Sequence, residues 1–195
     1  MIKKLFITLL TTTIVTTALL SHNPSVIAED NLTKYDYNVK DTINATYKEI
    51  PSIEKDYFLK EGYHIIILKE GQKIYDIDNS YNKEATGLID YKNKRIYIQY
   101  FEDKEIMINN TWHELGHMLD ESNGFISETN DFNNIWEERD IFFSCFNGDM
   151  SYFKNNRREC FAQMYSTYKM FPKWTIENFP YIYNYFLVLE TEDCI

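Results

Sequence analysis

The chain has 195 residues and a formal net charge of −10, from 20 basic and 30 acidic side chains. This length favours a single domain, large enough to bury a hydrophobic core. The acidic balance argues against nucleic acid or an anionic lipid surface as a general partner, because both repel a negatively charged protein.

Residues 1–28 have the parts of a secretory signal peptide. An apolar run rich in threonine follows Lys3 and Lys4, and small residues end at Ala28, where we expect cleavage. The apolar run is short for a membrane span. We therefore expect residues 29–195 to form one secreted, extracellular domain without a stable membrane anchor. Loss of the two lysines would take the net charge from −10 to −12.

The chain contains three cysteines, Cys145, Cys160 and Cys194. An odd number leaves at least one thiol free or paired outside the chain, so the pattern is not that of a disulfide scaffold. We expect buried thiols. A bridge between Cys145 and Cys160 stays open as the alternative in an oxidising compartment.

The first elements after the leader are predicted helices and a strand. Apolar residues recur at helical spacing within residues 38–61, where Pro51 fits the start of a second helix and Gly62 its end. The β-branched run Tyr63–Leu68 predicts a buried strand. His64 at its start is a candidate metal ligand.

Residues 71–84 predict a polar loop with a short strand at Lys73–Ile77. Thr86–Asp90 and Arg95–Tyr100, separated by a short polar turn, predict a β-hairpin. If its second strand lies at the edge of a sheet, its free backbone groups could pair with an extended peptide. A purely structural hairpin is the alternative.

The stretch His113-Glu114-Leu115-Gly116-His117 has the pattern H-E-x-x-H. Residues four apart lie on one face of a helix, so His113 and His117 could bind one Zn²⁺. Glu114 would then be placed to take a proton from a metal-bound water, whose pKa zinc lowers to about 7. A chance match on an ordinary core helix is the alternative.

The flanks of the motif favour a helix. Ile108, Trp112, Leu115 and Leu119 form an apolar stripe that is separate from the two histidines, and Gly124 predicts the end of the helix. Further helices are predicted over three later ranges, the last of them with Pro180 in its first turns. These ranges are 131–145, 156–170 and 175–189.

A catalytic zinc with two histidine ligands needs a third protein ligand. Asn123 stands where a metzincin has its third histidine, which excludes that class. Four acidic residues stay open as the third ligand: Asp120, Glu137, Glu138 and Glu159. Asp120, one turn beyond His117, is better suited to accept the imidazole N–H and orient the ring. A Cys160 thiolate would be unusual beside this motif.

Peptide hydrolysis also needs a donor for the oxyanion that forms at the scissile carbonyl. Tyr152 precedes Glu159 by seven residues in a predicted loop, and its phenol is a candidate among the sixteen tyrosines of the chain.

The motif, Tyr152 and Glu159-Cys160-Phe161-Ala162 together resemble the catalytic domain of anthrax toxin lethal factor and the related secreted Pro-Pro endopeptidases. The resemblance implies that His113, His117 and Glu159 bind one Zn²⁺ per chain, with Glu114 as general base and Tyr152 as oxyanion donor. It covers about residues 86–168 well. Arg158 and Cys160, on either side of the third ligand, depart from the pattern of the family.

The expected fold is α+β and zincin-like, with a small mixed sheet packed on the motif helix and further helices around it. The expected function is that of a secreted zinc metalloendopeptidase, acting as a monomer on an extended polypeptide. The resemblance implies a proline-containing substrate or, for a toxin, a host protein. A secreted binding module or toxin component of the same fold, without catalysis, is the alternative.

Overall fold

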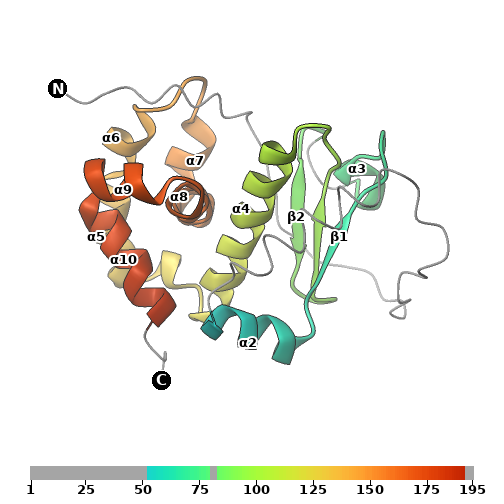
Figure 1. Ribbon diagram of the computed structural model, residues 1–195, viewed down its shortest axis with the longest axis horizontal. Coiled ribbons are helices and arrows are strands. Elements are labelled where there is room, and N and C mark those ends of the chain that lie inside the picture. The colour runs from blue at the N-terminus through green and yellow to red at the C-terminus, as the bar shows by residue number, and fades with distance from the viewer. Residues whose placement is uncertain (1–51, 80–82, 192–195) are drawn as a thin grey trace.

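Figure 1 shows a computed structural model of the chain, in which residues 52–79 and 83–191 are described. The expected signal peptide, the expected helix before Ser52 and Cys194 lie outside these residues. The elements in chain order are α2 (Ser52–Glu61), β1 (His64–Ile67), α3 (Ile74–Ile77), β2 (Gly87–Asp90), β3 (Arg95–Ile98), α4 (Lys104–Ser122), η2 (Ile126–Glu128), η3 (Asn130–Phe132), α5 (Asn133–Glu137), α6 (Arg139–Phe143), α7 (Ser151–Asn155), α8 (Arg157–Met170), α9 (Pro172–Asn178) and α10 (Pro180–Thr191). This mixture of a small sheet and many helices confirms the α+β class.

The three strands form one sheet in the order β1-β3-β2. The predicted hairpin is confirmed: β2 and β3 pair antiparallel, and β1 pairs parallel with β3. The Asp90 side chain closes the turn by accepting hydrogen bonds from the backbone N–H groups of Lys92 and Asn93. Because β3 is the middle strand, it offers no free edge to a peptide, and of the two alternatives the structural hairpin is the one observed. In the described part of the chain the edges are β1 and β2.

Two expectations near the first strand also need correction. β1 is only partly buried, with His64 exposed, because it lies at the edge of the sheet. Residues 74–77 form helix α3 and not a strand. The Asp76 carboxylate accepts the backbone N–H of Lys73 at 2.8 Å, and this local bond favours a helical turn.

Helix α4, which carries the H-E-x-x-H motif, stands between the sheet on one side and α8 with the other C-terminal helices on the other (Figure 1). Its start is capped by Asp103, whose side chain accepts the backbone N–H of Glu105. The chain leaves the helix through Gly124, which has φ +66°. Gly62, with φ +73°, ends α2 in the same way. Both predicted helix ends are confirmed.

The C-terminal helices are more broken than the sequence predicts. The range 131–145 divides into η3, α5 and α6, and at the junction of α5 and α6 the Arg139 guanidinium donates to the backbone carbonyl of Trp136. The range 175–189 divides into α9 and α10 at Phe179, whose φ of −137° and ψ of 61° are not helical. Proline disfavours the helical conformation of the residue before it, so Pro180 starts a new helix. Helix α8 is confirmed, with Asn156 as its cap.

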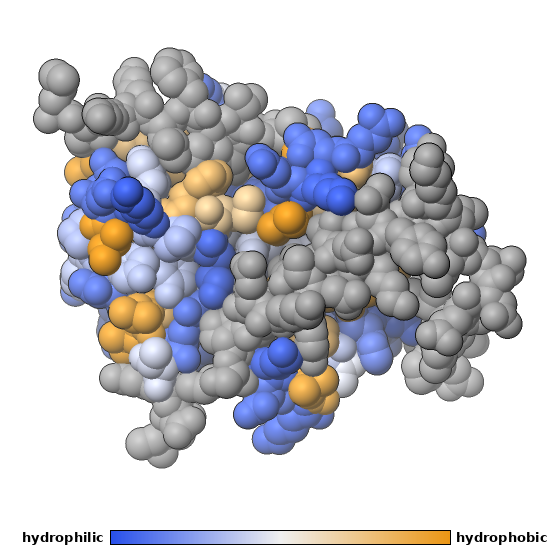
Figure 2. Space-filling view, in the orientation of Figure 1, coloured by the Kyte–Doolittle hydropathy of each residue, from blue (hydrophilic) through white to orange (hydrophobic). Residues whose placement is uncertain are grey.

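The main hydrophobic core is rich in aromatic side chains and extends from α2 and the sheet across α4 and α8 to the C-terminal helices. A smaller cluster packs on α3 and the strands: Leu68, Ile74, Ala85, Leu88 and Tyr97. On the face shown in Figure 2, the apolar residues form separate areas among polar ones. None of the helices in the described ranges combines the length and the apolar character needed to cross a bilayer.

Candidate metal centre

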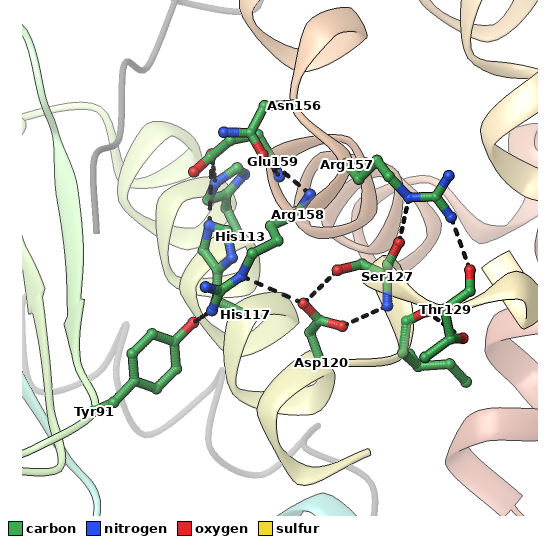
Figure 3. A network of polar contacts seen from close by, with 11 residues as sticks. Tyr91, His113, His117, Asp120, Ser127, Thr129, Asn156, Arg157, Arg158 and Glu159 are labelled. Carbon is green, nitrogen blue, oxygen red and sulfur yellow. Dashed lines mark hydrogen bonds and ion pairs between the residues drawn. The ribbon is translucent and has the colours of Figure 1, made fainter. Parts of the chain in front are cut away.

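Helices α4 and α8 bring His113, His117 and Glu159 together in the interior (Figure 3). Nε2 of His113 lies 3.2 Å, and Nε2 of His117 3.5 Å, from the same oxygen of Glu159, Oε2. One ligating atom from each residue lies within 4.8 Å of the others. All three side chains are buried, with 2% exposure or less. This group could therefore hold a metal ion.

A close contact between the two helices sets this geometry. A Cβ added at Gly116 would lie 2.9 Å from Cα of Ala162 and 3.2 Å from its carbonyl oxygen. The helices therefore touch through their backbones. Gly116 precedes His117 by one residue, and Ala162 follows Glu159 by three, close to one turn of α8. The contact thus holds Glu159 opposite the two histidines.

Gln163 orients the His113 ring. Its Oε1 lies 3.2 Å from Nδ1 of His113, so Nδ1–H donates to Gln163 and the lone pair of Nε2 faces Glu159. Nε2 of His113 and Oε2 of Glu159 are then both acceptors, and two acceptors 3.2 Å apart need a proton or a metal ion between them. Gln163 was missed in the sequence, where its only signal is its position one turn after Glu159.

Burial and neighbouring groups set the charge of the His113 and Glu159 side chains. Burial lowers the pKa of His113, which keeps the imidazole neutral. Burial raises the pKa of Glu159, but attraction to His117 and a hydrogen bond with the His113 imidazole outweigh it and lower the pKa to about 2. A neutral imidazole and an ionised carboxylate are the forms that bind metal ions.

Buried polar atoms without hydrogen-bond partners also indicate that these residues suit a metal ion. Both ring nitrogens of His117 and both carboxylate oxygens of Glu114 are buried and accept or donate no hydrogen bond among the described residues. Buried polar groups are normally paired, since desolvation without compensation is costly. A metal ion would satisfy one ring nitrogen of His117, and a water molecule would satisfy the Glu114 carboxylate. Two imidazoles and one carboxylate suit zinc and other first-row divalent metals.

Glu114 lies on the sheet side of the same centre. Its side chain has no exposed surface, and a Cβ added at Gly87 of β2 would overlap its carboxylate. Burial, and then the negative charge of Glu159, raise the pKa of Glu114 well above its ordinary value. Both effects favour the protonated form of this carboxyl group.

Asp120 lies one turn beyond His117 but stays outside the metal-binding group. Its carboxylate accepts the backbone N–H of Ser127 at 2.8 Å and the Ser127 hydroxyl at 2.7 Å, and lies 3.7 Å from Nε of Arg158 (Figure 3). These bonds join α4 to η2. The hydrogen bond from His117 to Asp120 that we expected is not formed.

The other candidates for the third ligand also stay outside the group. Glu137 is exposed on α5, and Glu138 lies at the end of that helix. His64 is exposed at the edge strand β1. Cys160 points away to Met164, with its sulfur 3.8 Å from the Met164 sulfur, and burial raises the pKa of its thiol.

Tyr152 lies on α7, a short helix where the sequence predicted a loop. Its ring centroid is 5.5 Å from that of Phe153, and the Phe153 ring is 6.0 Å from that of His113. Helix α7 thus borders the metal centre. The role of Tyr152 as an oxyanion donor stays a prediction.

Two arginines anchor the start of α8. Arg158 donates to the Tyr91 hydroxyl at 2.8 Å, and its guanidinium lies 4.3 Å from the Phe125 ring centroid. Arg157 donates to the carbonyl oxygens of Ser127 and Thr129 (Figure 3). These contacts tie the turn that carries Glu159 to the hairpin and to the loop after α4.

No protein-family model, curated protein or solved structure matches the chain significantly.

Proposed function

We propose that this protein is a secreted zinc metalloendopeptidase of the lethal-factor-like kind. The observation that carries the proposal is the buried group of His113, His117 and Glu159, with the unpartnered carboxylate of Glu114 beside it. An ordinary core helix has no reason to bury four such groups together, because each costs desolvation energy.

The residues of the chain take separate parts in the proposed reaction. Bound zinc would supply Lewis acidity for the scissile carbonyl and the attacking water. His113, His117 and Glu159 would hold the ion, and Gln163 would keep the His113 ring in its ligating tautomer. Glu114 would accept the proton of the attacking water and deliver it to the leaving amine, which its raised pKa favours. Tyr152 would donate to the oxyanion.

The sheet supports an extended polypeptide as the substrate. Among the described residues β2 is an edge strand; it packs beside α4, and its residue Gly87 approaches Glu114. A peptide that added to this edge would run past the general base, which is the β-augmentation mode of binding. The resemblance to Pro-Pro endopeptidases adds proline-containing peptides to the substrates to be tested, and the resemblance to lethal factor adds host proteins.

The test combines metal analysis with a peptide-library digest read by mass spectrometry. Wild-type protein should contain one zinc per chain and cleave peptides at defined sites, and a chelator should abolish cleavage. Glu114→Ala should keep the zinc and lose nearly all turnover, whereas Glu159→Ala should lose the zinc. Cleavage by Glu114→Ala at the wild-type rate would refute the mechanism. Bound zinc without cleavage of any peptide would favour a non-catalytic binding module.

A further inference from the structure

Gly87 on β2 is a glycine that its backbone conformation does not require. Its φ lies outside the left-handed region, so an alanine could adopt the same conformation. What limits a side chain here is space, because an added Cβ would require the Glu114 side chain to shift. The three heavy atoms nearest to an added Cβ all belong to Glu114: Oε1, Cδ at 3.0 Å and Cγ at 3.1 Å.

The contact matters because no hydrogen bond holds the Glu114 carboxylate in place. Neither of its oxygens has a partner among the described residues, and the side chain is fully buried. The wall formed by Gly87 therefore limits where the carboxylate lies.

Helix α4 cannot withdraw from an added Cβ without a further cost. On its other side Gly116 already touches the backbone of Ala162, which leaves no room for the helix to move toward α8. The Glu114 side chain, and not the helix, would then take up the displacement. Its carboxylate would move away from β2 within a tightly packed interior.

We propose that Gly87 is a positioning residue for Glu114: the missing side chain lets the carboxylate lie against β2 at the distance that proton transfer requires. The inference rests on the proposed function where it concerns catalysis, but the contact itself is tested without any substrate.

A double-mutant cycle of thermal unfolding, measured in a chelator, tests the contact. Gly87→Ala should lower Tm by roughly 2 to 6 °C in the presence of Glu114, because overpacking a core is destabilising. The same change in a Glu114→Ala background should leave Tm unchanged or raise it, since alanine is favoured over glycine inside a strand. In a Glu114→Gln background, where the side chain keeps its size, Gly87→Ala should again lower Tm.

Two results of this cycle would overturn the proposal. One is an equal Tm change in all three backgrounds. The other is failure of Gly87→Ala to fold in every background, which would mean that the strand itself needs glycine. If Gly87→Ala folds only together with Glu114→Ala, the contact is supported.

The catalytic arm measures zinc content, kcat and KM of Gly87→Ala. Zinc content should match wild type, KM should stay within about twofold, and kcat should fall roughly 100-fold, the effect expected of a misplacement near 1 Å. An unchanged kcat would refute the positioning role. Failure of the proposed function is recognised separately, because the wild-type protein would then cleave nothing while the unfolding cycle still decides the contact.

Discussion

The contact between Gly116 and Ala162 leads to a prediction about both stability and metal affinity. A Cβ at residue 116 would lie 2.9 Å from Cα of Ala162. Non-bonded carbon atoms prefer about 3.5 to 4.0 Å, so Gly116→Ala has to separate α4 and α8 locally by about 0.6 to 1 Å. Backbone atoms cannot rotate out of the way, unlike the end of a side chain.

The magnitude follows from two opposing effects. Overpacking costs about 1 to 3 kcal/mol, and replacing glycine by alanine in a helix returns about 1 kcal/mol. The metal-free variant should therefore lose about 1 kcal/mol of unfolding free energy, or roughly 2 to 4 °C in Tm. Metal sites tolerate distance errors of about 0.2 Å. Moving Glu159 away from the histidines by several times that distance should weaken zinc binding by about 10- to 100-fold.

The assay is thermal unfolding in a chelator, together with competition for zinc against a chromophoric chelator. Lys104→Ala, exposed in the first turn of the same helix, is the control and should change neither value. If Gly116→Ala binds zinc within twofold of wild type, the helix contact does not set the ligand distances and the reasoning is refuted.

Three further predictions follow from the metal centre. Gln163→Ala should weaken zinc binding by about 10-fold or more, whereas Gln163→Glu keeps an acceptor for His113 and should restore it; equal affinities would remove Gln163 from the site. Glu114→Gln should raise the Tm of the chelated protein at pH 8 and less so at pH 5. The reason is that a folded pKa raised above the ordinary 4.5 makes the wild type lose stability as pH rises above 4.5. A gain that does not depend on pH would contradict the raised pKa. Tyr152→Phe should lower kcat by about 100-fold or more with zinc retained, and an unchanged kcat would exclude Tyr152 as the oxyanion donor.

Features that depend on neighbours in the chain were predictable. The motif helix, its end at Gly124 and helix α8 follow from spacing and caps that lie within a few residues. The hairpin follows from a turn that Asp90 closes by itself. These elements came out as predicted because each local signal agrees with the packing around it.

Predictions from local sequence were wrong where a side chain bonds the backbone within the segment or where a strand from elsewhere in the chain pairs with it. At the junction of α5 and α6, where periodicity predicts one continuous helix, the Arg139 guanidinium donates to the backbone carbonyl of Trp136. Strand β3 lies in the middle of the sheet only because β1 pairs with it. In the chain, α3 and β2 separate these two strands. Periodicity within one segment carries no information on either point.

The sequence by itself determined that His113 and His117 share one face of a helix, with Glu114 beside them, because four residues make about one helical turn. The choice among Asp120, Glu137, Glu138 and Glu159 as the third member of the group needed the tertiary structure. Which acid reaches the histidines depends on how closely two helices approach. That approach is set by Gly116 against the backbone of Ala162, a contact between residues far apart in the chain.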